Sequence, residues 1–359
     1  MNTSLSNFAA QLRRLISRPG AVLDAARFDV LARELFALQF AANPAYRRVC
    51  EARQQTPAAA GHWTEIPCVP TAAFKEFEFS SLPPAERTAV FHSSGTTEQK
   101  PSRHFHGAES LALYEASLWS WFQVHFSGAS RFVFLTPGPA AAPRSSLVHM
   151  FETVRKNTAA AGAAEFFGRV AADGAWELDF AAVIPALRSA STASRPVTVL
   201  GTAFSFVHLL DHLAENKLSL QLPENSRVME TGGYKNRSRT MPKSELHGLI
   251  TRHVGVPRAR IICEYGMSEL SSQAYDSAGA PDARGFHFPP WARARIISPE
   301  TGREVAEGET GLIRILDLAN AFSVAAIQTE DLGVRRGGGV ELLGRAQRAE
   351  PRGCSLMTA

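Results

Sequence analysis

The sequence predicts an α/β fold with mixed β-sheets flanked by helices and a late β-rich subdomain. Residues 197–213 form a short apolar run, a turn of small residues and an amphipathic stretch, which is the strand-and-helix alternation of such folds. Residues 292–318 instead hold apolar stretches with Gly302 and Gly308 at turns, which predicts consecutive strands. With 359 residues and 45% hydrophobic content, the chain can bury a large core.

The N-terminal part of the chain is predicted to be helical. Residues 8–16 and 28–43 place apolar side chains at helical intervals with arginines between them. The pattern changes near residue 63, because residues 62–74 bring two prolines and an extended rhythm. We therefore expect residues 1–62 to form a helical layer packed on a main domain that spans residues 63–359.

The centre of the chain supplies the elements of the expected sheet. Residues 111–126 predict a long amphipathic helix whose Trp119 and Trp121 pack in a core. Residues 131–139 predict a buried strand that ends in a turn, and residues 259–270 repeat the pattern of apolar strand and polar turn.

Composition indicates neither a nucleic-acid partner nor a membrane span. The net charge of +4 is a small excess for this length. No apolar run approaches the roughly 18–20 residues that a spanning helix needs, and the N-terminal segment lacks a signal peptide's apolar centre. The cysteines form no zinc or C-x-x-C pattern, so we expect reduced thiols in a cytoplasmic protein. They are Cys50, Cys68, Cys263 and Cys354.

Four polar turns stand out, and in α/β folds ligands gather where strands end. They lie at residues 91–105, 229–238, 263–276 and 328–345. The first turn is rich in hydroxyls around a glycine and is followed by a lysine, so its donors and its cation suit a phosphate chain. The residues that would contact phosphate there are Ser93, Ser94, Gly95, Thr96, Thr97 and Lys100.

The motifs in these turns resemble those of the adenylate-forming enzymes, which include acyl-CoA synthetases, luciferases and peptide-synthetase adenylation domains. "SSGTT", Lys100, "EYGMSE", "TEDLG" and "GR" occur in that order, and the resemblance covers most of the chain from about residue 64. Within this superfamily, "METGGYKNRSR", "EYGMSELSSQAYD" and the ending "RGCSL" look like those of LuxE-type acyl-protein synthetases. The resemblance implies ATP and Mg²⁺ as cofactors and a carboxylic acid, a fatty acid above all, as substrate.

The resemblance and the chemistry of adenylation suggest roles for five residues. Glu269 would hold the metal and take part in catalysis, since Mg²⁺ on phosphates needs one or two carboxylate ligands. Tyr265 offers a ring face to adenine, and Asp331 suits the two ribose hydroxyls. Ser268 matches a residue that touches the α-phosphate in related enzymes, and Arg345 matches an arginine that helps to hold the nucleotide.

Two further groups of small residues complete the predicted site. The paired glycines Gly232 and Gly233 would let the backbone approach a flat ligand closely. Gly201, Thr202 and Phe204 follow a predicted strand and are expected to form part of the acyl pocket.

Cys354 is the predicted acyl acceptor, because in LuxE-type enzymes a cysteine near the C-terminus receives the acyl group as a thioester. A thiol near a chain end can reach an acyl adenylate, and the nearby Arg352 would favour its thiolate form. The resemblance further implies a protein partner, an acyl reductase that takes up the acyl group.

Two features depart from the wider superfamily. Glu98 stands where related loops have a glycine, and Lys100 is displaced by one position, so the phosphate role of Lys100 is the least secure. The sequence also ends near residue 359, where such enzymes continue into a small lid domain. We therefore expect the lid to be lacking, as in LuxE-type chains.

Three alternatives remain open at the level of sequence. An aryl- or acyl-CoA ligase would share most of the motifs, and a catalytically silent nucleotide-binding scaffold would be compatible with Glu98. A serine hydrolase is a weaker alternative, because "GMSEL" begins like a G-x-S-x-G nucleophile turn but ends in Leu270.

Overall fold

The computed structural model describes most of the chain. No helix among the described residues is both long enough and apolar enough to cross a membrane. The described residues are 3–18, 20–93, 100–129, 131–158, 163–232, 241–276 and 285–346.

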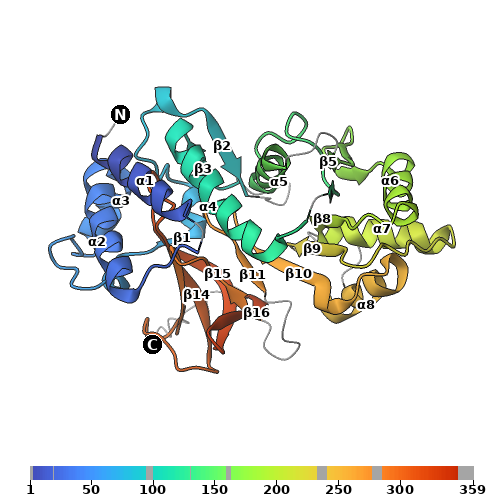
Figure 1. Ribbon diagram of the computed structural model, residues 1–359. Helices are drawn as coiled ribbons and strands as arrows, with labels where there is room; N and C mark the ends of the chain where they lie inside the picture. The colour runs from blue at the N-terminus through green and yellow to red at the C-terminus, as the bar shows by residue number, and fades with distance from the viewer. Residues whose placement is uncertain are drawn as a thin grey trace, which may run out of the picture.

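Five strands form the parallel half of a large mixed sheet (Figure 1). Each neighbouring pair is parallel, in the order β10, β9, β8, β4, β5. The strands are short apolar runs that are mostly buried, as parallel strands covered on both faces should be. Their bounds are β4 (Phe132–Phe134), β5 (Ala164–Phe166), β8 (Thr198–Thr202), β9 (Arg227–Thr231) and β10 (Ile261–Tyr265).

Helices cover both faces of this parallel half. One layer packs on Val228 and Ile261, and the other packs on Met229 and Ile262, because successive side chains of a strand point to opposite faces. The first layer contains α6 (Phe180–Thr192), α7 (Ala203–Glu215) and α8 (Lys243–Val254); the second contains α4 (Ala108–Phe126) and α5 (Ser146–Asn157).

The other half of the sheet is antiparallel and is formed mainly by the C-terminal part of the chain. It continues from β10 through β11, β12, β16, β15 and β14 to β13, and the short β1 pairs with β15 in parallel. Their bounds are β1 (Val69–Pro70), β11 (Ala274–Asp276), β12 (Phe286–His287), β13 (Ala292–Ile297), β14 (Thr310–Asp317), β15 (Ala326–Arg336) and β16 (Gly339–Arg345).

Smaller elements complete the described chain. Two hairpins stand apart from the large sheet: β2 (Ala89–His92) with β3 (Arg103–His106), and β6 (Gly168–Val170) with β7 (Trp176–Leu178). The 3₁₀ turns are η1 (Trp63–Glu65), η2 (Thr71–Lys75), η3 (Pro84–Glu86) and η4 (Arg258–Arg260).

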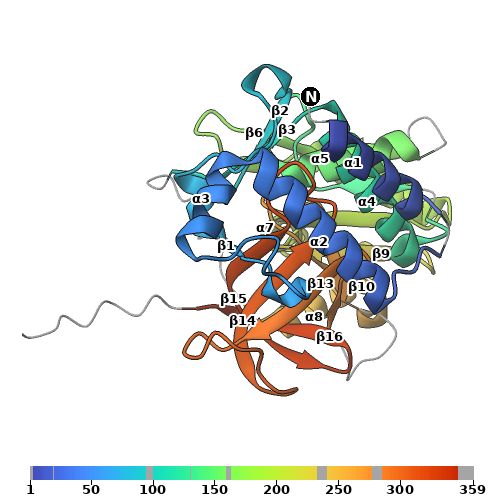
Figure 2. The ribbon, with the colours of Figure 1, turned by 90° about the vertical axis from the view of Figure 1, so that its left-hand side faces the viewer.

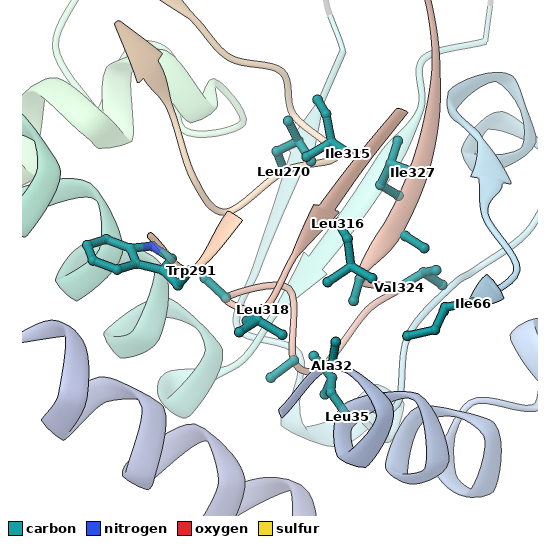
Figure 3. Packing of buried hydrophobic residues seen from close by; sticks show 14 of the residues in the cluster. Ala32, Leu35, Ile66, Leu270, Trp291, Ile315, Leu316, Leu318, Val324 and Ile327 are labelled. Carbon is teal, nitrogen blue, oxygen red and sulfur yellow. The ribbon is translucent and has the colours of Figure 1, made fainter. Parts of the chain in front are cut away.

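The N-terminal helices pack on the antiparallel half of the sheet. Figure 2 shows α2 lying over these strands, and Figure 3 shows Ala32 and Leu35 of α2 beside Leu318 and Val324 in one shared core. The side chain of Asp24 caps the first turn of α2 by accepting from a backbone N–H. The helices are α1 (Thr3–Ile16), α2 (Ala25–Ala42) and α3 (Pro44–Ala52).

The predicted α/β class, with mixed sheets, flanking helices and a late β-rich part, is confirmed. The helix expected at residues 111–126 is α4, and Trp119 and Trp121 pack against buried side chains as predicted. The division of the chain at residues 62 and 63 stays a prediction, since the N-terminal helices share their core with β13, β14 and β15.

Candidate active site

Three polar side chains lie in register at the carboxyl ends of neighbouring strands. Thr202 of β8 pairs with Thr231 of β9, which pairs with Glu264 of β10. The hydroxyl of Thr231 donates a hydrogen bond to the carboxyl group of Glu264. The sheet therefore offers a row of hydroxyl and carboxyl groups at the edge where α/β folds bind ligands.

Glu264 is a functional candidate that sequence reasoning missed. It is buried, and burial raises the pKa of its carboxyl group to about 7, with the nearby charge of Glu230 acting in the same direction and the bond from Thr231 opposing it. A buried carboxyl group with a pKa near neutrality is typical of functional sites. The available clue was a glutamate inside an otherwise apolar strand.

The turn after β10 holds Glu269 in a buried polar network. Ser102 donates to one carboxylate oxygen at 2.5 Å, and Ser268 donates to the other at 3.0 Å. The side-chain amide of Asn320 donates to the backbone carbonyl of Glu269 at 2.7 Å. Ser102 belongs to the first polar turn, so this bond joins the first and third polar turns.

The backbone of this turn has support from a histidine. The Nδ1 group of His104 donates to the carbonyl oxygen of Ser268 at 2.7 Å. Burial lowers the pKa of His104 to about 4, so the ring is neutral at physiological pH and serves as a hydrogen-bond donor. His104, on β3, therefore has a structural role in this turn.

Two serines that follow Glu269 anchor the turn from the opposite side. Ser271 donates its backbone N–H, and Ser272 its hydroxyl, to the carboxylate of Asp317 at 2.9 and 2.7 Å. The hydroxyl of Ser271 also donates to Asn320 at 2.6 Å. The "SELSSQ" stretch is thus fixed by the end of β14 and the loop after it, and sequence reasoning named neither Asp317 nor Asn320.

Tyr265, Asp331 and Arg345 form a second group. The Tyr265 hydroxyl donates to Asp331 at 2.7 Å, and the Arg345 guanidinium lies 3.6 Å from the same carboxylate. The ring of Tyr265 packs on Phe286, with centroids 5.6 Å apart. Third and fourth motifs therefore meet through direct contacts.

The two groups belong to the same end of the sheet. Tyr265 ends β10, and Glu269 lies four residues later in the turn. Burial raises the pKa of Glu269, and the hydrogen bonds from Ser102 and Ser268 and the charge of Arg345 act in the opposite direction. Side chains from three of the four polar turns are thus gathered in one place.

Lys100 lies away from these carboxyl groups. Its ammonium group pairs with exposed Glu76 at 3.3 Å. Ser93 exchanges hydrogen bonds with Ser102: the Ser102 N–H donates to the Ser93 hydroxyl at 3.0 Å, and the Ser93 N–H donates to the Ser102 carbonyl at 3.3 Å. Ser93 therefore joins the Glu269 network through Ser102, whereas Lys100 does not.

Several predicted residues lie outside the described residues. Gly232 is described and has φ of +69°, a left-handed conformation that favours glycine, and no atom of the described residues would contact a side chain there. Its neighbour Gly233 lies outside. So do Ser94, Gly95, Thr96, Thr97, Glu98 and Cys354.

The residues suggested for an acyl pocket have mixed settings. A side chain at Gly201 would come within 2.9 Å of the Leu135 Cβ atom, so glycine is required there by packing. Thr202 caps α7 by accepting from the Ser205 N–H at 3.0 Å, and Phe204 contacts the ring of His208. Of these three, Thr202 lies in the row with Thr231 and Glu264.

Glu269 also has the chemistry of a magnesium ligand. It is a carboxyl group in a polar site, 5% exposed, with hydroxyls on both oxygens. Mg²⁺ keeps several water molecules and takes one or two carboxylates in phosphate-binding sites, so this donor set fits the ion.

Comparison with known proteins identifies the family of the chain. The acyl-protein synthetase family LuxE matches residues 27–359. The chain belongs to the LuxE family. It is therefore an enzyme of the ligase class, acting on a carboxylic acid with ATP, and the resemblance drawn from the motifs is confirmed.

Two curated relatives carry the same name. A long-chain-fatty-acid–luciferin-component ligase of Aliivibrio fischeri is 24% identical over 353 residues, which cover 92% of this chain and 87% of the relative. The ligase of the same name from Vibrio harveyi is 20% identical over 197 residues, which cover 50% of this chain and 49% of the relative.

Solved structures of adenylate-forming enzymes share the fold. A 2-hydroxyisobutyryl-CoA ligase in complex with 2-HIB-AMP superposes with a TM-score of 0.63 at 15% identity, over 86% of this chain. This chain spans only 63% of that ligase's length. The McyG A-PCP structure with phenylalanyl-adenylate superposes with a TM-score of 0.50 at 17% identity, over 74% of this chain and 42% of its own.

Proposed function

We propose that this LuxE-family ligase activates a long-chain fatty acid as an acyl adenylate and transfers the acyl group to its own Cys354. The observation that supports this most strongly is the joining of Ser102, Glu269, Tyr265 and Asp331 at the end of β10. These residues come from three of the four polar turns, and all but Ser102 lie within motifs of the adenylate-forming pattern. The names of the curated relatives favour a long-chain fatty acid as the substrate.

In the first half-reaction, a carboxylate oxygen of the acid attacks the α-phosphorus of ATP and pyrophosphate leaves. The negative charge that builds on phosphate oxygens would be met by Ser268 and by the hydroxyl-rich turn of Ser93, Ser94, Gly95, Thr96 and Thr97. When bound at Glu269, Mg²⁺ would supply further charge neutralisation on the phosphates. Lys100 would join this set only by leaving Glu76.

The adenosine half of ATP would lie along the group at the ends of β10, β15 and β16. The Asp331 carboxylate, steadied by Tyr265 and Arg345, would accept hydrogen bonds from the ribose hydroxyls. The backbone at Gly232 and Gly233 would approach the adenine ring opposite Tyr265. The acyl chain would extend past Thr202, Gly201 and Phe204.

In the second half-reaction, the thiolate of Cys354 attacks the acyl carbonyl carbon and AMP leaves with the bonding electron pair. The resulting thioester conserves the activation of the acyl group, so a partner acyl reductase could receive it. We further propose a cytoplasmic site of action, because the described cysteines are unpaired thiols, as in reducing compartments. These cysteines are Cys50, Cys68 and Cys263.

The two half-reactions can be tested separately. Fatty-acid-dependent exchange of pyrophosphate into ATP reports adenylation, and covalent labelling by radioactive fatty acid reports thioester formation. We expect the Glu269→Gln variant to lose both, by about 100-fold or more in exchange, because it removes the charge that would hold the metal. Cys354→Ser should keep the exchange and lose the label.

The outcomes separate this proposal from its alternatives. Undiminished labelling of Cys354→Ser would exclude Cys354 as the acceptor. Formation of acyl-CoA without any protein-bound acyl group would indicate a CoA ligase. Absence of exchange with every acid in the wild type would indicate a scaffold. Cys68→Ser serves as the control, since Cys68 is buried and belongs to none of these motifs.

A further inference from the structure

Three potential metal ligands converge behind the proposed nucleotide site. Glu230 of β9 and Cys263 of β10 are register partners on adjacent parallel strands, and His247 of α8 lies over them. All three side chains are buried: Glu230 is 6% exposed, Cys263 2% and His247 1%. Among the described residues, they form a group whose ligand atoms all lie within 4.8 Å of one another.

Two of the three distances between the ligand atoms match the edges of a tetrahedral zinc site, and the sulfur–nitrogen distance is slightly longer. The Cys263 sulfur lies 3.3 Å from a Glu230 carboxylate oxygen and 3.8 Å from the His247 Nε2 atom, and that nitrogen lies 3.4 Å from the same oxygen. Zinc bonds of about 2.0–2.3 Å at tetrahedral angles give edges of about 3.3–3.6 Å. The separation between His247 and Glu230 is longer than an ordinary N–H···O hydrogen bond.

The charges around the group also favour a divalent cation. A zinc ion with one thiolate, one carboxylate and one neutral imidazole has no net charge, which suits a buried site. The ammonium group of Lys243 also acts on Cys263 and Glu230, and it lies 3.9 Å from the carboxylate of Asp276.

We propose that Glu230, His247 and Cys263 bind a Zn²⁺ ion through oxygen, nitrogen and sulfur, with the fourth position open to water or another donor. Mixed O, N and S ligands are typical of zinc in proteins, and the thiolate disfavours Mg²⁺ and Ca²⁺. This site is distinct from the magnesium site proposed at Glu269 and does not depend on the proposed reaction.

The ion would fasten α8 to the sheet beneath the nucleotide site. Tyr265 lies two residues after Cys263 on the same strand, and its ring packs on Phe286. The ammonium group of Lys243, at the start of α8, lies 5.3 Å from the centroid of the Phe286 ring. Zinc bound here would therefore fix the strand end from which Tyr265 reaches Asp331.

The decisive experiment measures metal on the untagged wild-type chain. We expect elemental mass spectrometry to find about one zinc per chain in the purified protein. After chelation and dialysis, the protein should take up about one equivalent of added zinc again. Replacement by Co²⁺ should give a thiolate-to-cobalt charge-transfer band in the near ultraviolet. Cys263→Ser should lose that band, and His247→Gln should lower the zinc content by about tenfold or more.

Matched controls come from the same elements. His253→Gln on α8 and Cys68→Ser should keep both zinc and the cobalt band, because neither side chain belongs to the group. The proposal is overturned if the wild type binds less than about a tenth of an equivalent of zinc after reloading. It is equally overturned if the wild type takes up Co²⁺ without showing the thiolate band. Both of these tests use the wild type alone, so neither depends on a variant that folds. In either case, the trio is a hydrogen-bonded group only.

Discussion

At the scale of single residues, the site depends on two buried carboxyl groups with different surroundings. Glu269 accepts from two serine hydroxyls and lies near the charge of Arg345. Glu264 accepts from Thr231 but has the negative charge of Glu230 nearby. Burial raises the pKa of both carboxyl groups, but the serine hydroxyls and Arg345 favour the charged form of Glu269, whereas the charge of Glu230 favours the protonated form of Glu264.

Glu264 should make stability depend on pH. Its pKa of about 7 in the folded state lies above the ordinary pKa of a glutamate. Its contribution to the free energy of unfolding is therefore fully present in acid and is lost as the pH rises through 7. Between pH 5 and pH 8, the wild type should therefore lose more stability than Glu264→Gln. We expect this difference in the free energy of unfolding to be on the order of 3 kcal/mol. Urea unfolding at both pH values measures this difference.

The comparison isolates Glu264 because other titrating groups are common to both proteins. The pKa values of His104 and His125 are lowered to about 4 by burial, which acts in the opposite direction as the pH rises. If the free energy of unfolding changed equally with pH in the wild type and in Glu264→Gln, Glu264 would not titrate in this range.

At the scale of elements, the turns could be predicted and their supports could not. The strand at β10 and the polar turn after it follow from an apolar run and a cluster of hydroxyl residues, which are local patterns. The bond from Ser102 to Glu269 joins residues 167 positions apart. A zinc pattern was not expected from the cysteine spacing, because Glu230, His247 and Cys263 come from two strands and a helix.

Gln39 gives a test of how the N-terminal helices are fixed to the sheet. Its buried amide donates to the carbonyl groups of Asn320 and Ala321 at 2.8 and 3.1 Å, and accepts from the Ala325 N–H at 3.0 Å. Gln39→Ala leaves three buried backbone groups unpaired, so we expect a loss of about 3 kcal/mol in the free energy of unfolding.

Gln11 of α1 provides the matched control for this substitution. Its side chain is exposed, so Gln11→Ala should change the free energy of unfolding by no more than about 0.5 kcal/mol. Urea unfolding of both variants would contradict the account if their losses were equal.

At the scale of the whole molecule, the fold brings together motifs that the sequence separates widely. The order of the motifs was sufficient to predict the class of fold and the family, because each motif is a short contiguous stretch. Their proximity depends on the pairing of β10 with β9 and on the return of β15 and β16 to the same sheet. That pairing is non-local, and local patterns carry no information about it.

The central claim is that the end of β10 forms one site for both halves of an acyl adenylate. The most direct measurement is calorimetric titration of the untagged chain with a non-hydrolysable long-chain acyl adenylate analogue. We predict one analogue per chain, and affinity about 10- to 100-fold weaker for Asp331→Ala, because the ribose hydroxyls lose a charged acceptor. Asp173→Ala, in the exposed β6–β7 hairpin, should bind like the wild type. Equal affinity of Asp331→Ala and the wild type would contradict the account.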